Sequence, residues 1–425
     1  MVQLSNHPIP RNESEALALQ SAALKQHRKQ LRRIKRAYDN KNWPAVRHAV
    51  RAFLNHFANK YVAAEQILRC SDFYPSEDGD WDGVYRLASM INVFETNDEE
   101  VQIRSKLKGN GTRRYYCDFG CLNKSRQLLV KFVVDELHEP NPLTFGVRGQ
   151  GISSMTELIT CALRDGYGWA QVADVRDCFP SITQQHVSEC FGWLPAACVN
   201  SVLLSAGYNY VVSGRDRRRL GRSASVVVGA RRGIPQGSAV FNLVANAVIN
   251  RIFSQEELSG SLVPRFADDF LLLAKTREEL SVNALMLENV FRREEAGPLQ
   301  LRFDEVRRVD HGFWHLKRHF KHRYEEWSMV SPISVRMPAG KILAVIEDVE
   351  ASLACGRPSG QEYRRLLNRV HGLFGAYKGI NFLATIHHEL VASIKGARAS
   401  QVRTRRVLSG FTRDELLPLA IAPAR

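Results

Sequence analysis

Two adjacent aspartates, Asp268 and Asp269, lie between apolar, strand-prone stretches in the segment 265–273. Two strands joined by a tight turn would bring both carboxylates to the tip of a hairpin. Adjacent carboxylates repel each other, and a divalent cation relieves that repulsion. Their hard oxygen atoms favour Mg²⁺ or Mn²⁺. Taken alone, the pair also fits a hydrated turn at the protein surface.

A third aspartate, Asp174, ends a segment that alternates apolar and polar residues from Gly168, as a half-buried strand does. The chain after it is predicted to turn into a helix through Thr183 and Val187. Three carboxylates at one place can hold two cations, which activate an attacking hydroxyl and steady a phosphate leaving group. Alone, Asp174 fits a helix cap equally well.

A glycine loop, Gly233-Ile-Pro-Gln-Gly237, lies 59 residues after Asp174 and 35 before Asp268. Its two glycines would let the backbone approach a base pair closely. A helix is predicted after it, carrying Asn246, Val248, Ile249 and Ile252. Without the aspartates, such a loop would favour a plain turn.

In this order and spacing, the motifs resemble those of the reverse transcriptase family. Residues 174–182 resemble its first palm motif, 233–246 its Pro-Gln-Gly motif, 266–269 its Tyr-x-Asp-Asp motif, 144–151 the fingers motif of group II intron-like enzymes, and 358–377 its helical thumb. The resemblance covers roughly residues 110–395.

The resemblance implies a mixed α/β (α+β) right-hand polymerase with fingers, palm and helical thumb, preceded by a helical N-terminal extension. We expect a basic, RNA-binding extension over 1–110, fingers and palm over 111–335, and the thumb with a basic tail over 336–425.

The implied activity is that of an RNA-directed DNA polymerase, a nucleotidyltransferase that uses two Mg²⁺ ions, with Mn²⁺ as a substitute. The expected metal ligands are the catalytic Asp174, Asp268 and Asp269 with the carbonyl of Val175. Phe179 would form a steric gate that selects deoxynucleotides. The other implied nucleotide-binding residues are Gln236, Gly237, Arg114 and Arg126, and the implied nucleic-acid contacts are Arg148, Phe266 and Gly312.

Three positions depart from the family pattern. Phe266 replaces the usual tyrosine, Phe241-Asn242 replaces Ser-Pro, and Glu305-Val306-Arg307 replaces Glu-Lys-Thr. The family's general-acid lysine is therefore absent, and arginine, which stays protonated, is not assigned that role. The histidines His311, His315, His319 and His322 suggest a zinc site, with His315 and His319 on one helix face, but a basic nucleic-acid surface is favoured.

Positive charge dominates the chain, with 59 Lys and Arg against 44 Asp and Glu and a net charge of +15. Residues 25–51 hold ten Lys or Arg and one acid, Asp39, and residues 215–232 hold seven Arg. Such runs suit a phosphate backbone, although each alone also fits a solvated helix face. Arg28, Arg32 and Arg36 are the predicted RNA contacts in the first run.

The N-terminal part is predicted to be helical over 12–70, with a break at 39–44 and a second amphipathic helix after it. Leu17, Leu24 and Leu31 recur every seven residues beside Ile34. This seam fits packing within the chain or self-association, and we favour packing. The oligomeric state is left open. Further along, Thr276 and Glu279 predict a capping box for a helix over 276–296.

The 425 residues are 44% hydrophobic, which excludes wholesale disorder, and the eight scattered cysteines do not suggest a disulfide framework. No apolar run approaches a membrane span, and the first residues do not form a secretory signal. We therefore expect a cytoplasmic protein with no membrane partner.

Among reverse transcriptases, the sequence resembles the bacterial "unknown group", many of which act in antiviral defence against phage. The resemblance implies deoxynucleoside triphosphates as substrates, a DNA primer and product, and a structured noncoding RNA as partner and template. Two alternatives stay open: a template-independent or protein-primed DNA polymerase on the same fold, and a non-catalytic RNA-binding or splicing-helper protein.

Overall fold

The computed structural model describes most of the chain between residues 10 and 395. The described residues are 10, 12–70, 81–107, 113–137, 141–147, 149–212, 223–253, 258, 260–322, 333–336, 339–354, 359–376, 388, 390–392 and 394–395. Arg148 and most of the second basic run, including 213–222, lie outside them.

The described residues combine helices with mixed sheets, which confirms the mixed α/β class predicted from the sequence. The chain divides into two compact units, each built from separate segments: 1–141, 175–254 and 287–301 in the first, and 142–174, 255–286 and 302–425 in the second. The predicted three-domain division stays a prediction.

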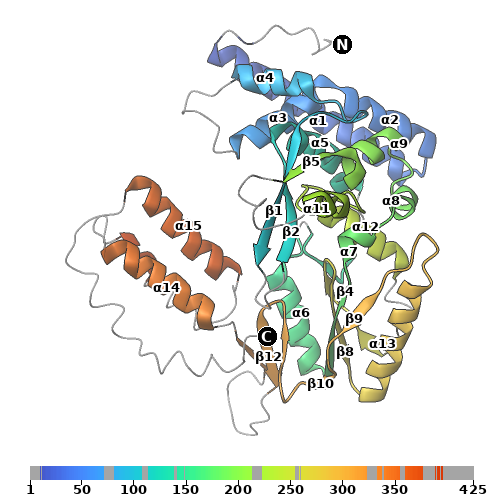
Figure 1. The fold of residues 1–425 in the computed structure, drawn as a ribbon, viewed down its shortest axis with the longest axis vertical. Helices are drawn as coiled ribbons and strands as arrows, with labels where there is room; N and C mark the ends of the chain where they lie inside the picture. The colour runs from blue at the N-terminus through green and yellow to red at the C-terminus, as the bar shows by residue number, and fades with distance from the viewer. Residues whose placement is uncertain are drawn as a thin grey trace. The chain divides into compact units, whose positions relative to one another are not determined.

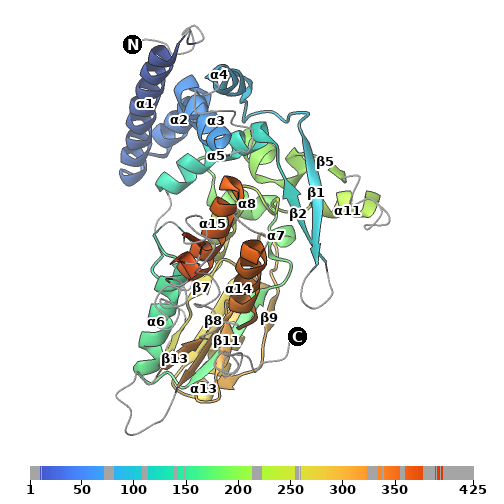
Figure 2. The same ribbon diagram turned by 90° about the vertical axis from the view of Figure 1, so that its left-hand side faces the viewer.

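Helices α1 (Glu13–Asp39), α2 (Trp43–Asn55), α3 (Phe57–Arg69) and α4 (Trp81–Met90) pack together and against α5 (Cys121–Leu137) in the first unit (Figure 2). The predicted break between α1 and α2 is confirmed. The side chain of Asn42 caps α2 by accepting a 3.1 Å hydrogen bond from the backbone N–H of Ala45.

The predicted leucine seam of α1 is wrong in its position. The helix buries Ala16, Leu19, Ala23, His27 and Ile34. Leu17 is instead 52% exposed, and Leu24 and Leu31 are half-buried. The small side chains of Ala16 and Ala23 let α1 lie close to the neighbouring helices, and His27 hydrogen-bonds to Asn59 in the interior. The buried face of α1 is therefore rotated away from the three leucines.

The buried histidine fixes α1 on two neighbouring helices. His27 Nδ1 lies 3.1 Å from Asn59 Oδ1, and Asn59 Nδ2 donates to the carbonyl of Phe53 at 2.8 Å. The imidazole ring also lies 4.7 Å, centroid to centroid, from the ring of Phe132 in α5. Burial lowers the pKa of His27, so it stays neutral in its apolar surroundings.

A three-stranded sheet also belongs to the first unit. β1 (Glu100–Leu107) pairs antiparallel with β2 (Arg113–Asp118) and parallel with β5 (Asn209–Val212) (Figure 1). The buried side chains Val101 and Ile103 of β1 and Tyr210 of β5 form a core with the adjacent Phe119 and Tyr208.

Short helices complete the first unit. They are α7 (Cys178–Ser181), α8 (Gln184–Cys190), α9 (Ala196–Cys198), a π-helical turn (Val199–Leu203), a 3₁₀ turn (Ser205–Gly207), α11 (Ser223–Ala230) and α12 (Phe241–Ile252). The helix predicted after Asp174 is thus two short helices, because Thr183 caps α8. The helix predicted after the glycine loop is confirmed as α12, in which Val248 and Ile249 are fully buried.

A seven-stranded sheet organises the second unit. Its order is β10-β4-β8-β7-β3, with β6 on β8 and β9 on β4. The strands are β3 (Thr144–Phe145), β4 (Trp169–Val175), β6 (Ser261–Leu262), β7 (Arg265–Phe266), β8 (Asp269–Ala274), β9 (Leu301–Phe303) and β10 (Arg307–Arg308). Helix α6 (Ile152–Arg164) packs Met155 and Ile159 against Leu271 and Leu273 of β8. In β8, the residues from 270 to 274 are fully buried.

Helix α13 (Arg277–Arg292) forms as predicted. Thr276 and Glu279 exchange the two 3.1 Å hydrogen bonds of a capping box. Its apolar face, formed by Leu280, Leu287 and Phe291, is fully buried.

The second unit continues with β11 (Phe313–His315), β12 (Arg318–His322) and β13 (Ile333–Arg336), an antiparallel sheet. Helices α14 (Ala339–Ala354) and α15 (Gly360–Ala376) follow and lie side by side (Figure 1). Their shared apolar core confirms the predicted return to helical structure after residue 340. None of the described helices combines the length and the apolar character needed to cross a membrane.

We predict that His315 makes the fold sensitive to acid. Its Nε2 is buried and has no hydrogen-bond partner among the described residues, and burial lowers its pKa to about 3. An unfolded histidine titrates near 6.5, so the unfolded state gains a proton first as the pH falls. The free energy of unfolding should fall by about 1.4 kcal/mol per pH unit below ~6.5.

Urea denaturation at two pH values tests this effect. Between pH ~7 and ~5 the wild type should lose about 2 kcal/mol more than His315→Gln. The exposed His48 offers a control, His48→Gln, which should behave as the wild type does. An equal acid loss in wild type and His315→Gln would contradict the assignment.

Candidate active site

Two of the three predicted carboxylates face each other across neighbouring strands. Asp174 on β4 lies directly opposite Asp269 on β8 in an antiparallel pair. Residues directly opposite in such a pair point to the same face, with Cβ atoms ~4.5–5.5 Å apart. On the same face, the next row inward holds Val172 opposite Leu271. The carboxylates therefore end an apolar face of the sheet.

The same row continues across β7 and β3. Phe266 pairs with Asp269, and Phe145 pairs with Phe266. Phe145 is buried, and Phe266 packs against the same core from a half-buried position. The Phe266 ring thus lies beside the Asp269 carboxylate, and Phe145 is its neighbour on the other side.

Asp268 lies in the two-residue turn between β7 and β8. The other turn residue, Ala267, has a left-handed backbone with φ 55°, which an L side chain rarely adopts. Arg265 is 2% exposed and its Nη1 donates to the carbonyl of Ala267 at 2.8 Å. A buried arginine thus holds a strained turn, and such strain often accompanies functional sites. No motif or spacing in the sequence singles out Arg265.

Arg302 on β9 forms an ion pair with Asp174 that sequence reasoning missed. Its Nε and Nη2 donate to the two carboxylate oxygens of Asp174, each at 2.9 Å. The Arg302 side chain is 70% exposed, and that of Asp174 is 29% exposed. An exposed pair of this kind contributes only about 0–1 kcal/mol. Arg302 therefore orients the Asp174 carboxylate, but the ion pair is weak enough for the carboxylate to exchange this partner for another.

The donor set suits a hard divalent cation in its chemistry. Asp174 and Asp269 offer carboxylate oxygens from two rigid strands, and Asp268 adjoins them in the turn. Val175, the expected carbonyl ligand, ends β4. Across the described ranges, no three His, Cys, Asp or Glu side chains already converge on one metal position.

The glycine loop belongs to the first unit, where it packs against the segment that carries Phe179. Gly233 has φ 63°, and a Cβ there would lie 2.0 Å from the carbonyl oxygen of Phe179. The neighbouring N–H of Ile234 donates to that same carbonyl at 3.0 Å. Only glycine permits this approach, so two of the predicted motifs are joined by backbone contact.

The second glycine of the loop contacts β2. Gly237 has φ 102°, and a Cβ there would lie 2.5 Å from the carbonyl oxygen of Cys117. The N–H of Cys117 donates to the carbonyl of Gln236 at 2.9 Å. The side chain of Gln236, predicted to bind a nucleotide, is half-buried and its backbone is thereby fixed.

Phe179 packs against one of the residues that depart from the family pattern. Its ring centroid lies 5.0 Å from that of Phe241, in an edge-on arrangement. Both rings are half-buried. The Phe241 ring therefore packs against the side of Phe179, the residue predicted to form the steric gate.

Arg126, predicted to bind a nucleotide, is buried in the structure, and its predicted role stays a prediction. This side chain is 1% exposed, and its guanidinium donates to the carbonyls of Asn92 and Glu95 and to the side chain of Asn123. Burial lowers its pKa, and these acceptors hold the charge. Through these hydrogen bonds, Arg126 joins α5 to the chain before β1.

The remaining predicted residues lie on separate elements. Arg114 lies in β2, opposite Lys106, and Gly312 lies in the turn before β11 with φ 84°. His315 and His319 lie on strands β11 and β12, so the helix face expected for them is wrong. Arg28, Arg32 and Arg36 are exposed on α1.

The chain matches no protein-family model and no curated protein. Membership of the reverse transcriptase family therefore stays a proposal that rests on the sequence motifs and the arrangement of the aspartates.

We predict that Gly233→Ala destabilises the loop. The new Cβ would overlap a backbone carbonyl, and an alanine at positive φ adds strain, so the free energy of unfolding should fall by about 2 kcal/mol or more. Gly229→Ala is a matched control four residues away, because nothing lies within 4 Å of its Cβ position and it is in helix α11.

Thermal and urea unfolding of both variants measures the difference. Gly229→Ala should be neutral or slightly stabilising, by up to about 1 kcal/mol. Equal effects of the two substitutions would refute the close approach of Gly233 to Phe179.

Proposed function

We propose that the chain is an RNA-directed DNA polymerase, a reverse transcriptase of the bacterial "unknown group", with fingers, palm and thumb. The observation that carries the proposal is the pairing of Asp174 with Asp269 beside Asp268. Their order along the chain and the Pro-Gln-Gly loop between them support it.

Asp174, Asp268 and Asp269 would hold two Mg²⁺ ions, which activate the primer 3′-hydroxyl and stabilise the leaving pyrophosphate. Asp174 can exchange its arginine partner for a cation because the exposed pair with Arg302 is weak. Arg265 holds the turn that carries Asp268, so the carboxylates need little reorganisation.

Phe179 is proposed to select deoxynucleotides by excluding a ribose 2′-hydroxyl. Its backbone is held by Gly233 and Ile234, and its ring contacts Phe241. A bulky group excludes a substituent well only when it cannot move aside, and these contacts limit its movement.

A role in antiphage defence with a noncoding RNA partner is proposed from the resemblance to the "unknown group" enzymes. The net charge of +15 supports a polyanionic partner.

A non-catalytic RNA-binding protein is the second candidate. The Asp174–Arg302 pair favours it, because a carboxylate already neutralised by an arginine has less need of a cation. Primer extension separates the two candidates.

We predict that Asp268→Ala/Asp269→Ala abolishes DNA synthesis. Removing two of the three proposed carboxylate ligands should lower primer extension on an RNA template, with Mg²⁺ and labelled deoxynucleotides, by roughly 10³-fold or more. Asp304→Asn is the matched control, since Asp304 is exposed and contributes its backbone N–H to Val172.

Wild type and Asp304→Asn should synthesise DNA at similar rates. RNA binding without any synthesis by the wild type would support the non-catalytic candidate. DNA product formed without added template would point to the template-independent or protein-primed alternative.

We predict that Phe179→Ala admits ribonucleotides. Loss of the ring should lower discrimination between deoxynucleotides and ribonucleotides by about tenfold or more, and Phe241→Ala should lower it by less. Phe179→Tyr, which keeps the bulk, should retain discrimination. Single-nucleotide incorporation measures the ratio, and unchanged discrimination in Phe179→Ala would contradict the gate.

A further inference from the structure

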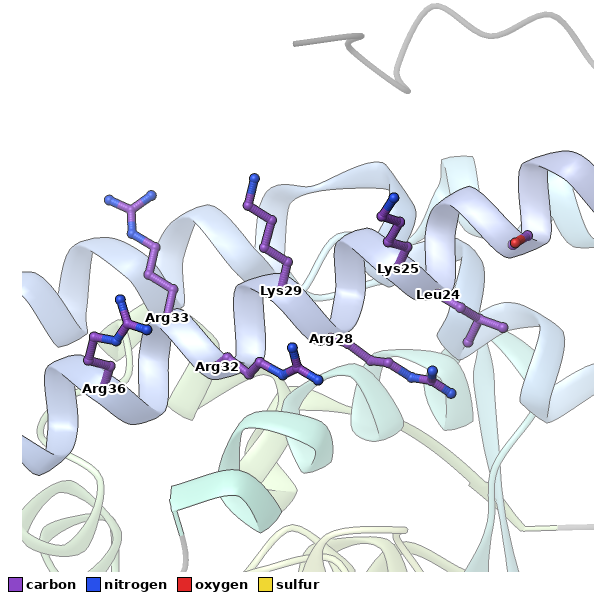
Figure 3. Close-up of a pocket in the computed structure, with 8 residues that line it drawn as sticks. Leu24, Lys25, Arg28, Lys29, Arg32, Arg33 and Arg36 are labelled. Atoms are coloured by element: carbon purple, nitrogen blue, oxygen red, sulfur yellow. The ribbon is translucent and has the colours of Figure 1, made fainter.

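Six cationic side chains share one face of α1, opposite the buried stripe. They are Lys25, Arg28, Lys29, Arg32, Arg33 and Arg36, and together with Ser21 and Leu24 they line a pocket (Figure 3). We call these six residues the basic face.

The basic face lacks compensating acids. Helix α1 has no Asp or Glu between residues 16 and 38. Its ion pair among the described residues joins Lys35 to Asp39 at 3.0 Å and includes no member of the basic face. Like charges four residues apart destabilise a helix. A polyanion bound on this face would remove that repulsion.

The six cations form two rows. Figure 3 shows Lys25, Lys29 and Arg33 pointing in one direction from this face of α1, and Arg28 and Arg32 pointing in another. Within each row, residues are four apart, which corresponds to a step of about 6 Å along the axis. Two parallel rows fit two phosphate backbones that border a groove better than they fit one small anion.

The basic face is held on a rigid support. The opposite side of α1 buries Ala23 and Ile34, and His27 bonds to Asn59. The cations are therefore presented from a fixed helix, and binding need not pay for folding of the helix itself.

A lipid surface is a poorer match than nucleic acid. A helix that lies on a membrane needs a broad exposed apolar face. In α1 the apolar face is buried, and the pocket contains one large apolar residue, Leu24, which is half-buried.

We infer that the basic face of α1 binds a double-stranded part of a structured RNA, with one cation row on each phosphate backbone. That the duplex is RNA rests on the proposed function, whereas the surface uses none of the three aspartates. Duplex RNA is read mainly through its shape and its phosphates, which suits a surface of cations without base-reading side chains.

Two triple variants test the two rows: Lys25→Gln/Lys29→Gln/Arg33→Gln and Arg28→Gln/Arg32→Gln/Arg36→Gln. A control with the same loss of charge, Arg86→Gln/Arg292→Gln/Arg293→Gln, changes exposed positions elsewhere on the first unit: Arg86 lies in α4, Arg292 ends α13 and Arg293 follows it. All are made in the Asp268→Ala/Asp269→Ala background and measured in EDTA without nucleotides. Failure of the polymerase proposal then leaves this measurement intact.

Binding to a duplex RNA of about 20 base pairs is measured across a salt series. Each row variant should weaken binding at least about tenfold and reduce the slope of log K against log salt by about 2 to 3, whereas the control should change neither. If the row variants bind RNA with the same affinity and salt slope as the control, the basic face is not the RNA-binding surface. An effect confined to one row, or tighter binding of single-stranded RNA or duplex DNA, would overturn the duplex RNA assignment.

Discussion

The register of β4 on β8 is the constraint on which the candidate site depends. Side chains alternate between the two faces of a strand, so a slip of one residue would move Asp174 to the face opposite Asp269. The apolar residues 270–274 of β8 oppose such a slip. They are fully buried, and a change of register would disrupt their packing. The hydrophobic core of the second unit thereby places two charges side by side at its edge.

Backbone proximity is the corresponding constraint in the first unit. The carbonyl of Phe179 accepts a hydrogen bond from the N–H of Ile234. Gly233 lies so close to the same carbonyl that no side chain fits at position 233. The glycine loop 233–237, which precedes α12, is therefore held in a fixed position against the segment that carries Phe179. Phe241 belongs to the same group of contacts, since its ring packs against Phe179.

Arginines in this chain show how surroundings decide the role of one residue type. Arg126 and Arg265 are buried and hold backbone carbonyls, so their charge is used inside the protein. Arg302 is exposed and holds a carboxylate weakly. Those of the basic face meet no carboxylate of α1 and remain available to a partner. Composition and net charge predict a polyanionic partner, but burial identifies which cations can meet it.

Local features of the fold were predictable from the sequence, because they depend on residues close together in the chain. The aspartate hairpin, the capping box of α13 and the break before α2 are of this kind. Other features join residues far apart in the chain. The pairing of Arg302 with Asp174, the burial of Arg126 and the rotation of α1 away from its leucines are decided by packing against distant segments. Helical periodicity gives a stripe of similar residues, but only the neighbouring helices determine which side of it is buried.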